Sequence, residues 1–170
     1  MRTRNFALID TALSKHAKSD STGISKVYVD RENRWYVSAK KYRIGPKGLI
    51  DIIFQLHDEG MEKIGIEKTA YTEAIHPFMQ DEMALRGKYP NIIQLSHGGI
   101  NKNVRIEGLT PKYEAGHIYH IEGECDDLET EELHDVVDSL AYGLKLCEPP
   151  YPEVYTEQYE AEVLYDDIGI

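Results

Sequence analysis

The chain has 170 residues, 41% of them hydrophobic and 29% charged, with a formal net charge of −11. This length suits one domain with its own core, and the composition is that of a globular protein. No run of about 18 apolar residues occurs, which argues against a membrane-spanning helix. Two cysteines, Cys125 and Cys147, form neither a metal-ligand motif nor a disulfide framework, so we expect a reducing compartment.

The negative charge is concentrated in the C-terminal third of the chain. Residues 122–170 contain 16 acidic residues and one lysine, whereas residues 1–121 contain 14 acidic and 18 basic residues. A mildly basic body therefore precedes an acidic end, and the net charge does not exclude a nucleic-acid partner. We interpret residues 1–148 as one folded domain and residues 149–170 as an acidic C-terminal tail.

Short apolar or alternating segments predict strands, and segments with helical spacing between Pro and Gly predict helices. In chain order the pattern predicts a strand at 5–13, two strands within 24–44 joined by a turn at 30–33, a helix at 46–60, a strand ending near Glu67, a helix at 72–87, a strand at 91–97, a loop at 98–112, a strand at 114–123 and a helix at 130–146. This order predicts an α/β fold with a central mixed β-sheet flanked by helices.

Two aspartates, Asp135 and Asp138, stand beside the apolar stripe near the start of the last helix. Acidic residues there can simply stabilise the helix dipole, by about 0.3–1 kcal/mol each. A second interpretation depends on Asp10 and Glu67, each of which closes a predicted strand. If those two strands are parallel neighbours, the four carboxylates meet at one end of the sheet. Such a cluster repels itself unless a cation neutralises it, and oxygen ligands select Mg²⁺ or Mn²⁺.

Four segments in this order resemble the RNase H-like nuclease superfamily, and in particular the C-terminal nuclease domain of the terminase large subunit of tailed bacteriophages. The segments are FALIDTALSKHAKSDSTGI, IGIEKTAYTEAI, NKNVRIEGLTPKYEAGHIYHI and LHDVVDSLAYGL. The resemblance covers roughly residues 5–146 and implies an RNase H-like fold. It also implies an endodeoxyribonuclease that hydrolyses phosphodiesters with two Mg²⁺ or Mn²⁺ ions.

The resemblance assigns catalytic and metal-binding roles to Asp10, Glu67 and Asp135. Asp138 matches an acid present in some relatives, and Asp20 matches an acid that follows the first strand in many terminases, so both are candidate metal ligands. His134 stands where many relatives have Asp, which leaves the ligand position at Asp135 filled.

The implied function is cleavage of concatemeric viral DNA during genome packaging, in the host cytoplasm. The implied partners are double-stranded DNA, the portal and the small terminase subunit. The packaging ATPase of the family is not in this sequence, which contains no G-x-x-x-x-G-K-[ST] motif. The alternatives are another RNase H-like DNA enzyme, such as a junction resolvase or transposase core, and a non-catalytic packaging docking module.

Basic residues in the predicted loops and at strand ends are candidates for contact with the DNA backbone. They are Lys15, Lys18, Lys40, Lys41, Arg43, Lys102 and Arg105. A solvated loop explains Lys15 and Lys18 equally well, and an exposed edge strand explains Lys40 and Lys41 equally well. The pair His117 and His120 is a poor zinc site, because residues three apart on a strand point to opposite faces.

Overall fold

The computed structural model describes residues 2–11, 21–129 and 134–151, and the side chains of residues 129, 134 and 135 lie outside that description. The described strands form one six-stranded mixed sheet in the order β5-β4-β1-β2-β3-β6. Their bounds are β1 (Arg4–Thr11), β2 (Thr22–Val29), β3 (Trp35–Tyr42), β4 (Lys63–Glu67), β5 (Ile92–Leu95) and β6 (Ile118–His120). β1, β2 and β3 form an antiparallel meander, whereas β4 runs parallel to β1 and β5 parallel to β4.

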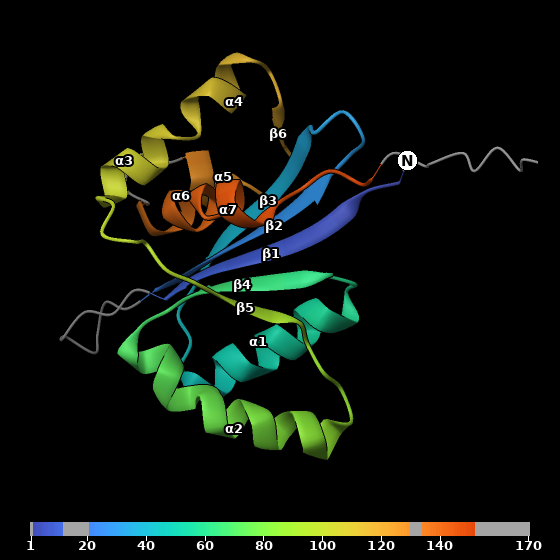
Figure 1. Ribbon diagram of the computed structural model, residues 1–170, viewed down its shortest axis with the longest axis vertical. Helices are drawn as coiled ribbons and strands as arrows, with labels where there is room; N and C mark the ends of the chain where they lie inside the picture. The colour runs from blue at the N-terminus through green and yellow to red at the C-terminus, as the bar shows by residue number, and fades with distance from the viewer. Residues whose placement is uncertain (1, 12–20, 130–133, 152–170) are drawn as a thin grey trace, which may run out of the picture.

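Helices cover both faces of the sheet (Figure 1). One face carries α1 (Pro46–Asp58) and α2 (Ala70–Arg86), which pack on β1 and β4 through a core that includes Ile9, Ile53 and Ile64. The other face carries α3 (Lys102–Glu107), α4 (Thr110–Glu114), α5 (Asp126–Glu129), α6 (His134–Ala141) and α7 (Gly143–Leu146). None of the described helices combines the length and the apolar character that a membrane crossing requires.

The predicted α/β architecture is confirmed, and so is the β2–β3 hairpin. β1 and β4 are parallel neighbours, which meets the condition for Asp10 and Glu67 to lie close together. In the hairpin turn, the buried Asp30 carboxylate accepts hydrogen bonds from the backbone N–H groups of Glu32 and Arg34 at 3.0 and 2.9 Å. Asn33 adopts a positive φ of 59°, a conformation that Asn tolerates better than most residues. The turn between the strands therefore has a local cause in the sequence.

The prediction of a loop at 98–112 is wrong, because α3 lies within this segment and α4 begins in it. Each helix has one local feature at its start. The Asn101 side chain accepts a hydrogen bond from the Asn103 N–H at 2.9 Å before α3, and Pro111 stands in the first turn of α4. Burial of Leu109 between the two helices fixes them on the sheet. The expected strand at 114–123 is also shorter than predicted, since β6 has three residues.

The last predicted helix, 130–146, is interrupted after Ala141, and its first four residues lie outside the described structure. A Cβ at Gly143 would lie 3.0 Å from the Trp35 ring and 3.1 Å from Leu8. Gly therefore permits close packing on the sheet at the cost of helix propensity. α6 itself is fixed by a buried contact, in which the hydroxyl groups of Ser139 and Ser25 lie 2.6 Å apart.

Candidate active site

One row of residues crosses the sheet at the ends of β4, β1 and β3. In the pairing register, Ile9 is opposite Ile66, so the next residues, Asp10 and Glu67, lie side by side on parallel strands. Asp10 is also opposite Gly23 of β2, and Gly23 is opposite Lys41 of β3. Gly23, which has no side chain and is buried, separates the carboxylates from Lys41 in this row. Two strand spacings, about 10 Å, separate the backbones of Asp10 and Lys41.

Asp10 and Glu67 lie on the sheet face that α6 and α7 cover. Alternation along β1 places Asp10 on the same side as Phe6 and Leu8, which pack in the core with residues of α6 and α7. On β4 the neighbouring Ile66 faces the opposite core with α1, so Glu67 points toward α6. The two carboxylates therefore share one face and one edge of the sheet.

The two carboxyl groups interact directly. Asp10 is only 4% exposed, and its side chain shares a hydrogen bond with Glu67. Burial raises the pKa of Asp10 to about 8, and the hydrogen bond and the charge of Glu67 contribute to the rise, as does the charge of Asp138. The charge of Lys102 acts in the opposite direction. The nearby positive charge of Lys102 does not offset the combined effect of burial and of the other two carboxyl groups on Asp10. Carboxyl groups in such surroundings commonly share a proton or bind a cation.

Tyr142 fixes the orientation of Glu67. The Tyr142 hydroxyl donates a hydrogen bond to Glu67 Oε1 at 2.9 Å, and the Tyr142 side chain is almost fully buried. Burial and this hydrogen bond raise the pKa of Tyr142 well above its usual value, so the hydroxyl stays a donor. On the backbone side, the Thr72 hydroxyl lies 2.9 Å from the carbonyl oxygen of Glu67 at the start of α2.

Asp138 is held by a cation of the chain itself. Arg105 donates from Nε to Asp138 Oδ1 at 3.1 Å and from Nη2 to Oδ2 at 2.6 Å. Lys102 Nζ lies 3.7 Å from the same Oδ2. The side chain of Asp138 is 3% exposed and that of Arg105 is 10% exposed, so the ion pair is largely shielded from water. The candidate role of Asp138 as a metal ligand stays a prediction.

Several residues singled out from the sequence lie outside the described structure. These are Lys15, Lys18 and Asp20, together with the acidic tail beyond Tyr151. Asp135 belongs to α6 and stands three residues before Asp138, but nothing is described of its side chain or of that of His134. The roles predicted for these residues therefore remain predictions.

The chemistry of the residues that are described fits a hard divalent cation. Asp10 and Glu67 supply carboxylate oxygens, which Mg²⁺ and Mn²⁺ prefer, and their mutual repulsion is relieved by a cation. Among the side chains that the structure describes, no three His, Cys, Asp or Glu residues form a metal-binding group. Water, substrate, Asp138 or a side chain outside the description, such as that of Asp135 on α6, are the candidates for further ligands.

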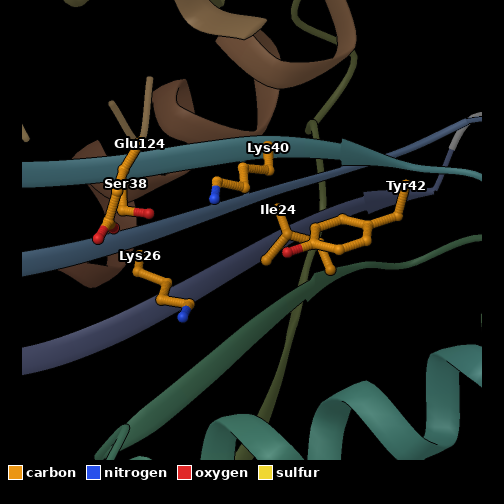
Figure 2. Close-up of a pocket in the computed structure, with 6 residues that line it drawn as sticks. All are labelled: Ile24, Lys26, Ser38, Lys40, Tyr42 and Glu124. Carbon is orange, nitrogen blue, oxygen red and sulfur yellow. The ribbon is translucent and has the colours of Figure 1, made fainter. Parts of the chain in front are cut away.

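The basic run at the end of β3 divides between the two sheet faces. Lys41 is on the carboxylate face, as alternation from the buried Ala39 requires, and its backbone N–H donates to Asp127 of α5 at 2.8 Å. Lys40 lies on the opposite face, in a cavity of about 140 Å³ that it shares with Lys26, Ser38 and Tyr42 (Figure 2). Arg43 follows at the exposed strand end. Of these three, only Lys41 shares both row and face with Asp10.

Sequence reasoning missed Tyr142 and the partners of Asp138. Tyr142 stands four residues after Asp138, so it faces the same side of the helix, and a Tyr at that spacing was the available signal. Arg105 was expected to contact DNA, whereas its donors are directed at Asp138 and at the carbonyl oxygen of Ile100. Arg105 and Asp138 are far apart in the sequence, and the packing of α3 against α6 brings them into contact.

Comparisons with known proteins identify solved structures of similar fold. No family model matches the sequence, and no curated protein matches it. Among solved structures, the fowlpox virus Holliday junction resolvase is similar at a TM-score of 0.53 and 13% identity, over 83% of this chain and 96% of that one. The large terminase nuclease of the thermophilic phage G20c is similar at a TM-score of 0.52 and 14% identity, over 85% and 83% of the two chains.

The chain has the RNase H-like fold. The expected fold class and the structural resemblance to a terminase nuclease are thereby confirmed. In this RNase H-like sheet, Asp10 and Glu67 occupy adjacent strand ends, as the sequence predicts. The resolvase has also been solved with Holliday junction DNA, in a structure that is similar at a TM-score of 0.53 and 11% identity.

Proposed function

We propose that the protein is a metal-dependent DNA endonuclease. The observation that supports this most is the Asp10–Glu67 pair, in which two carboxyl groups from neighbouring parallel strands share a hydrogen bond at one sheet edge. Structural pairing alone does not explain a buried carboxyl pair of this kind, because burial of like charges costs free energy. A divalent cation bound to the two carboxyl groups would offset this cost.

In this proposal Asp10, Glu67 and Asp135 would hold the divalent ions. Once bound, such ions would supply an activated water molecule for phosphodiester hydrolysis and would offset negative charge on the phosphate. The protein holds the ligands in position: Tyr142 orients Glu67, and the strand register fixes Asp10 beside it. Restraints on metal ligands by neighbouring hydrogen bonds commonly change metal affinity or activity by about 10- to 100-fold.

DNA reaches this site from the β3 side in the proposal. Lys41 is the basic side chain that stands in the same row as Asp10, two strands away across Gly23. A phosphate bound by Lys41 would therefore lie on the same sheet face as the carboxylates. Contact with the phosphate backbone carries no base preference, which fits cleavage with little sequence specificity.

For the biological role, we favour cleavage of concatemeric viral DNA during genome packaging, in the host cytoplasm. The portal and the small terminase subunit are the partners in that role, on the strength of the sequence resemblance. Junction resolution is the second candidate, because the TM-scores to the fowlpox resolvase and the terminase nuclease are nearly equal, at 0.53 and 0.52, and the match covers more of the resolvase chain.

Cleavage of matched substrates separates the two roles. We would compare an immobile four-way junction with a linear duplex of the same sequence, both with Mg²⁺ or Mn²⁺. A packaging nuclease cuts both at similar rates, whereas a resolvase cuts the junction at symmetrical positions and leaves the duplex intact. Binding of DNA with no cleavage of either substrate under any divalent ion would support the docking module instead.

A further inference from the structure

Arg105 is held at three points beside the carboxylate pair. Its Nε and Nη2 donate to the two oxygens of Asp138, and its Nη1 donates to the carbonyl oxygen of Ile100 at 2.9 Å. Its guanidinium lies 5.0 Å from the centre of the Tyr142 ring. A bidentate arginine that is also stacked on an aromatic ring has little rotational freedom. Arg105 is therefore a fixed positive charge within the site.

The guanidinium of Arg105 determines what else the Asp138 carboxylate can bind. Both oxygens of the Asp138 carboxylate accept hydrogen bonds from Arg105, and the aspartate side chain is almost inaccessible to water. A divalent ion bound to Asp138 would stand next to the guanidinium, and the two positive charges would repel one another. Arg105 and a metal ion therefore compete for the same carboxylate.

Through Tyr142 the ion pair also reaches Glu67. The ring of Tyr142 lies beside the guanidinium, and its hydroxyl donates to Glu67 Oε1. A continuous series of contacts thus runs from Asp138 through Arg105 and Tyr142 to Glu67. Asp138 acts in this series by positioning Arg105.

We propose that Arg105 is a built-in counter-cation, which occupies the place beside Asp138 that a divalent ion would otherwise take. Asp138 then positions Arg105 and does not ligate metal, and Arg105 limits how many ions the carboxylates bind. This inference rests on the proposed metal site, but it concerns the number of ions and the residue that sets it. Arg105 is not a catalytic residue in this account, since it acts by occupying the Asp138 carboxylate.

Counting bound Mn²⁺ tests the inference. Isothermal titration calorimetry and equilibrium dialysis give the number of ions bound by the wild-type protein, Arg105→Ala and Arg105→Ala/Asp138→Asn. We expect Arg105→Ala to bind one more ion than the wild type, because the Asp138 carboxylate becomes available. The double variant should lose that additional ion. An unchanged number in Arg105→Ala would overturn the inference.

Lys102→Ala is the matched control. It removes one positive charge from the same site, yet it leaves both hydrogen bonds between Arg105 and Asp138 in place. If Arg105 acts by occupying Asp138, Lys102→Ala keeps the wild-type number of ions. A gain of one ion in both variants would show that net charge alone sets the number, which contradicts the inference.

Two further variants keep the result decisive if Arg105→Ala does not fold. Arg105→Gln retains amide donors without the charge and should also gain an ion. Asp138→Asn in the wild-type background should keep the number of ions unchanged, whereas loss of an ion would show that Asp138 is a ligand and would overturn the inference. The proposed function has a separate readout, since Asp10→Asn should weaken Mn²⁺ binding whatever the role of Arg105.

Discussion

Asp10 and Glu67 extend from neighbouring parallel strands, and their carboxyl groups share a hydrogen bond on a sheet face that α6 covers. The pair cannot carry two full negative charges without strong repulsion, so either a proton or a cation must be present. Two measurable properties follow from this relationship: stability that depends on pH, and stability that depends on divalent metal.

When a chelator removes divalent metal, the free energy of unfolding should fall as the pH rises from about 4 to about 8. The folded protein holds the Asp10 proton up to a pKa of about 8, against an ordinary value of 3.8, so the unfolded chain binds fewer protons in this range. The stabilising contribution is therefore complete below the ordinary pKa and lost above pH 8. Urea unfolding at a series of pH values, monitored by circular dichroism, measures it.

Asp10→Asn is the control for this pH dependence, since the amide keeps the size of the side chain and does not titrate. The variant should be more stable than the wild type at pH 8 in chelator and should show a flatter pH profile. Saturating Mg²⁺ should flatten the wild-type profile as well, because the cation replaces the proton. A wild-type profile that is already flat in chelator would contradict the assignment of Asp10.

Tyr142→Phe should weaken metal binding and cleavage while the fold persists. The ring stays in the core, and only the hydrogen bond to Glu67 Oε1 is removed. The expected loss is about 10- to 100-fold in Mn²⁺ affinity or cleavage rate. Calorimetric titration with Mn²⁺ and a cleavage assay measure both. Unchanged values in a folded variant would show that Tyr142 does not orient Glu67.

Lys41→Ala should weaken DNA binding more than Lys40→Ala does. The two substitutions remove the same charge from adjacent residues, but Lys41 lies on the face of Asp10 and Lys40 in a cavity on the other face. Lys41→Ala should also reduce the slope of the logarithm of affinity against that of salt concentration by about 1. Fluorescence anisotropy with a labelled duplex at several salt concentrations tests this. Equal effects would place DNA elsewhere.

Asp135→Ala should abolish cleavage, whereas Asp138→Ala should retain measurable activity. The first residue is the proposed ligand on α6, and the second is already neutralised by Arg105. If the two aspartates served only the helix dipole, both substitutions would cost a fraction of a kcal/mol in stability and leave activity intact. A plasmid cleavage assay together with thermal unfolding of both variants distinguishes these outcomes.

Local patterns predicted the fold well where each element carries its own signal. The hydrophobic face of α1, its first-turn Pro46 and the turn at Asp30 all act within a few residues, so the sequence reveals them. α3 and α4 were not predicted, because they have only six and five residues and are stabilised by the burial of Leu109 rather than by their own periodicity. The interruption at Gly143 depends on the distant Trp35 ring, which no local pattern indicates.

The same distinction holds for the candidate site. Asp10 and Glu67 were predictable, because each ends an apolar strand and parallel strand ends converge. The partners of Asp138 were not, since Arg105 and Lys102 lie in a segment that the sequence suggested was a loop. Alternation does place Lys40 and Lys41 on opposite faces, but which face carries the carboxylates follows only from the register across β1, β2 and β3.

The most direct test of the nuclease assignment is nicking of supercoiled plasmid by the purified chain, with Mg²⁺, with Mn²⁺ or with EDTA. Asp10→Asn, Glu67→Gln and Asp135→Asn are compared with the wild type, and Asp81→Asn, on the exposed surface of α2, is the matched control. The account predicts cleavage by the wild type and by Asp81→Asn with either ion, none in EDTA, and a loss of several orders of magnitude in each of the three site variants. Undiminished cleavage in EDTA, or near wild-type cleavage by Asp10→Asn, would contradict it.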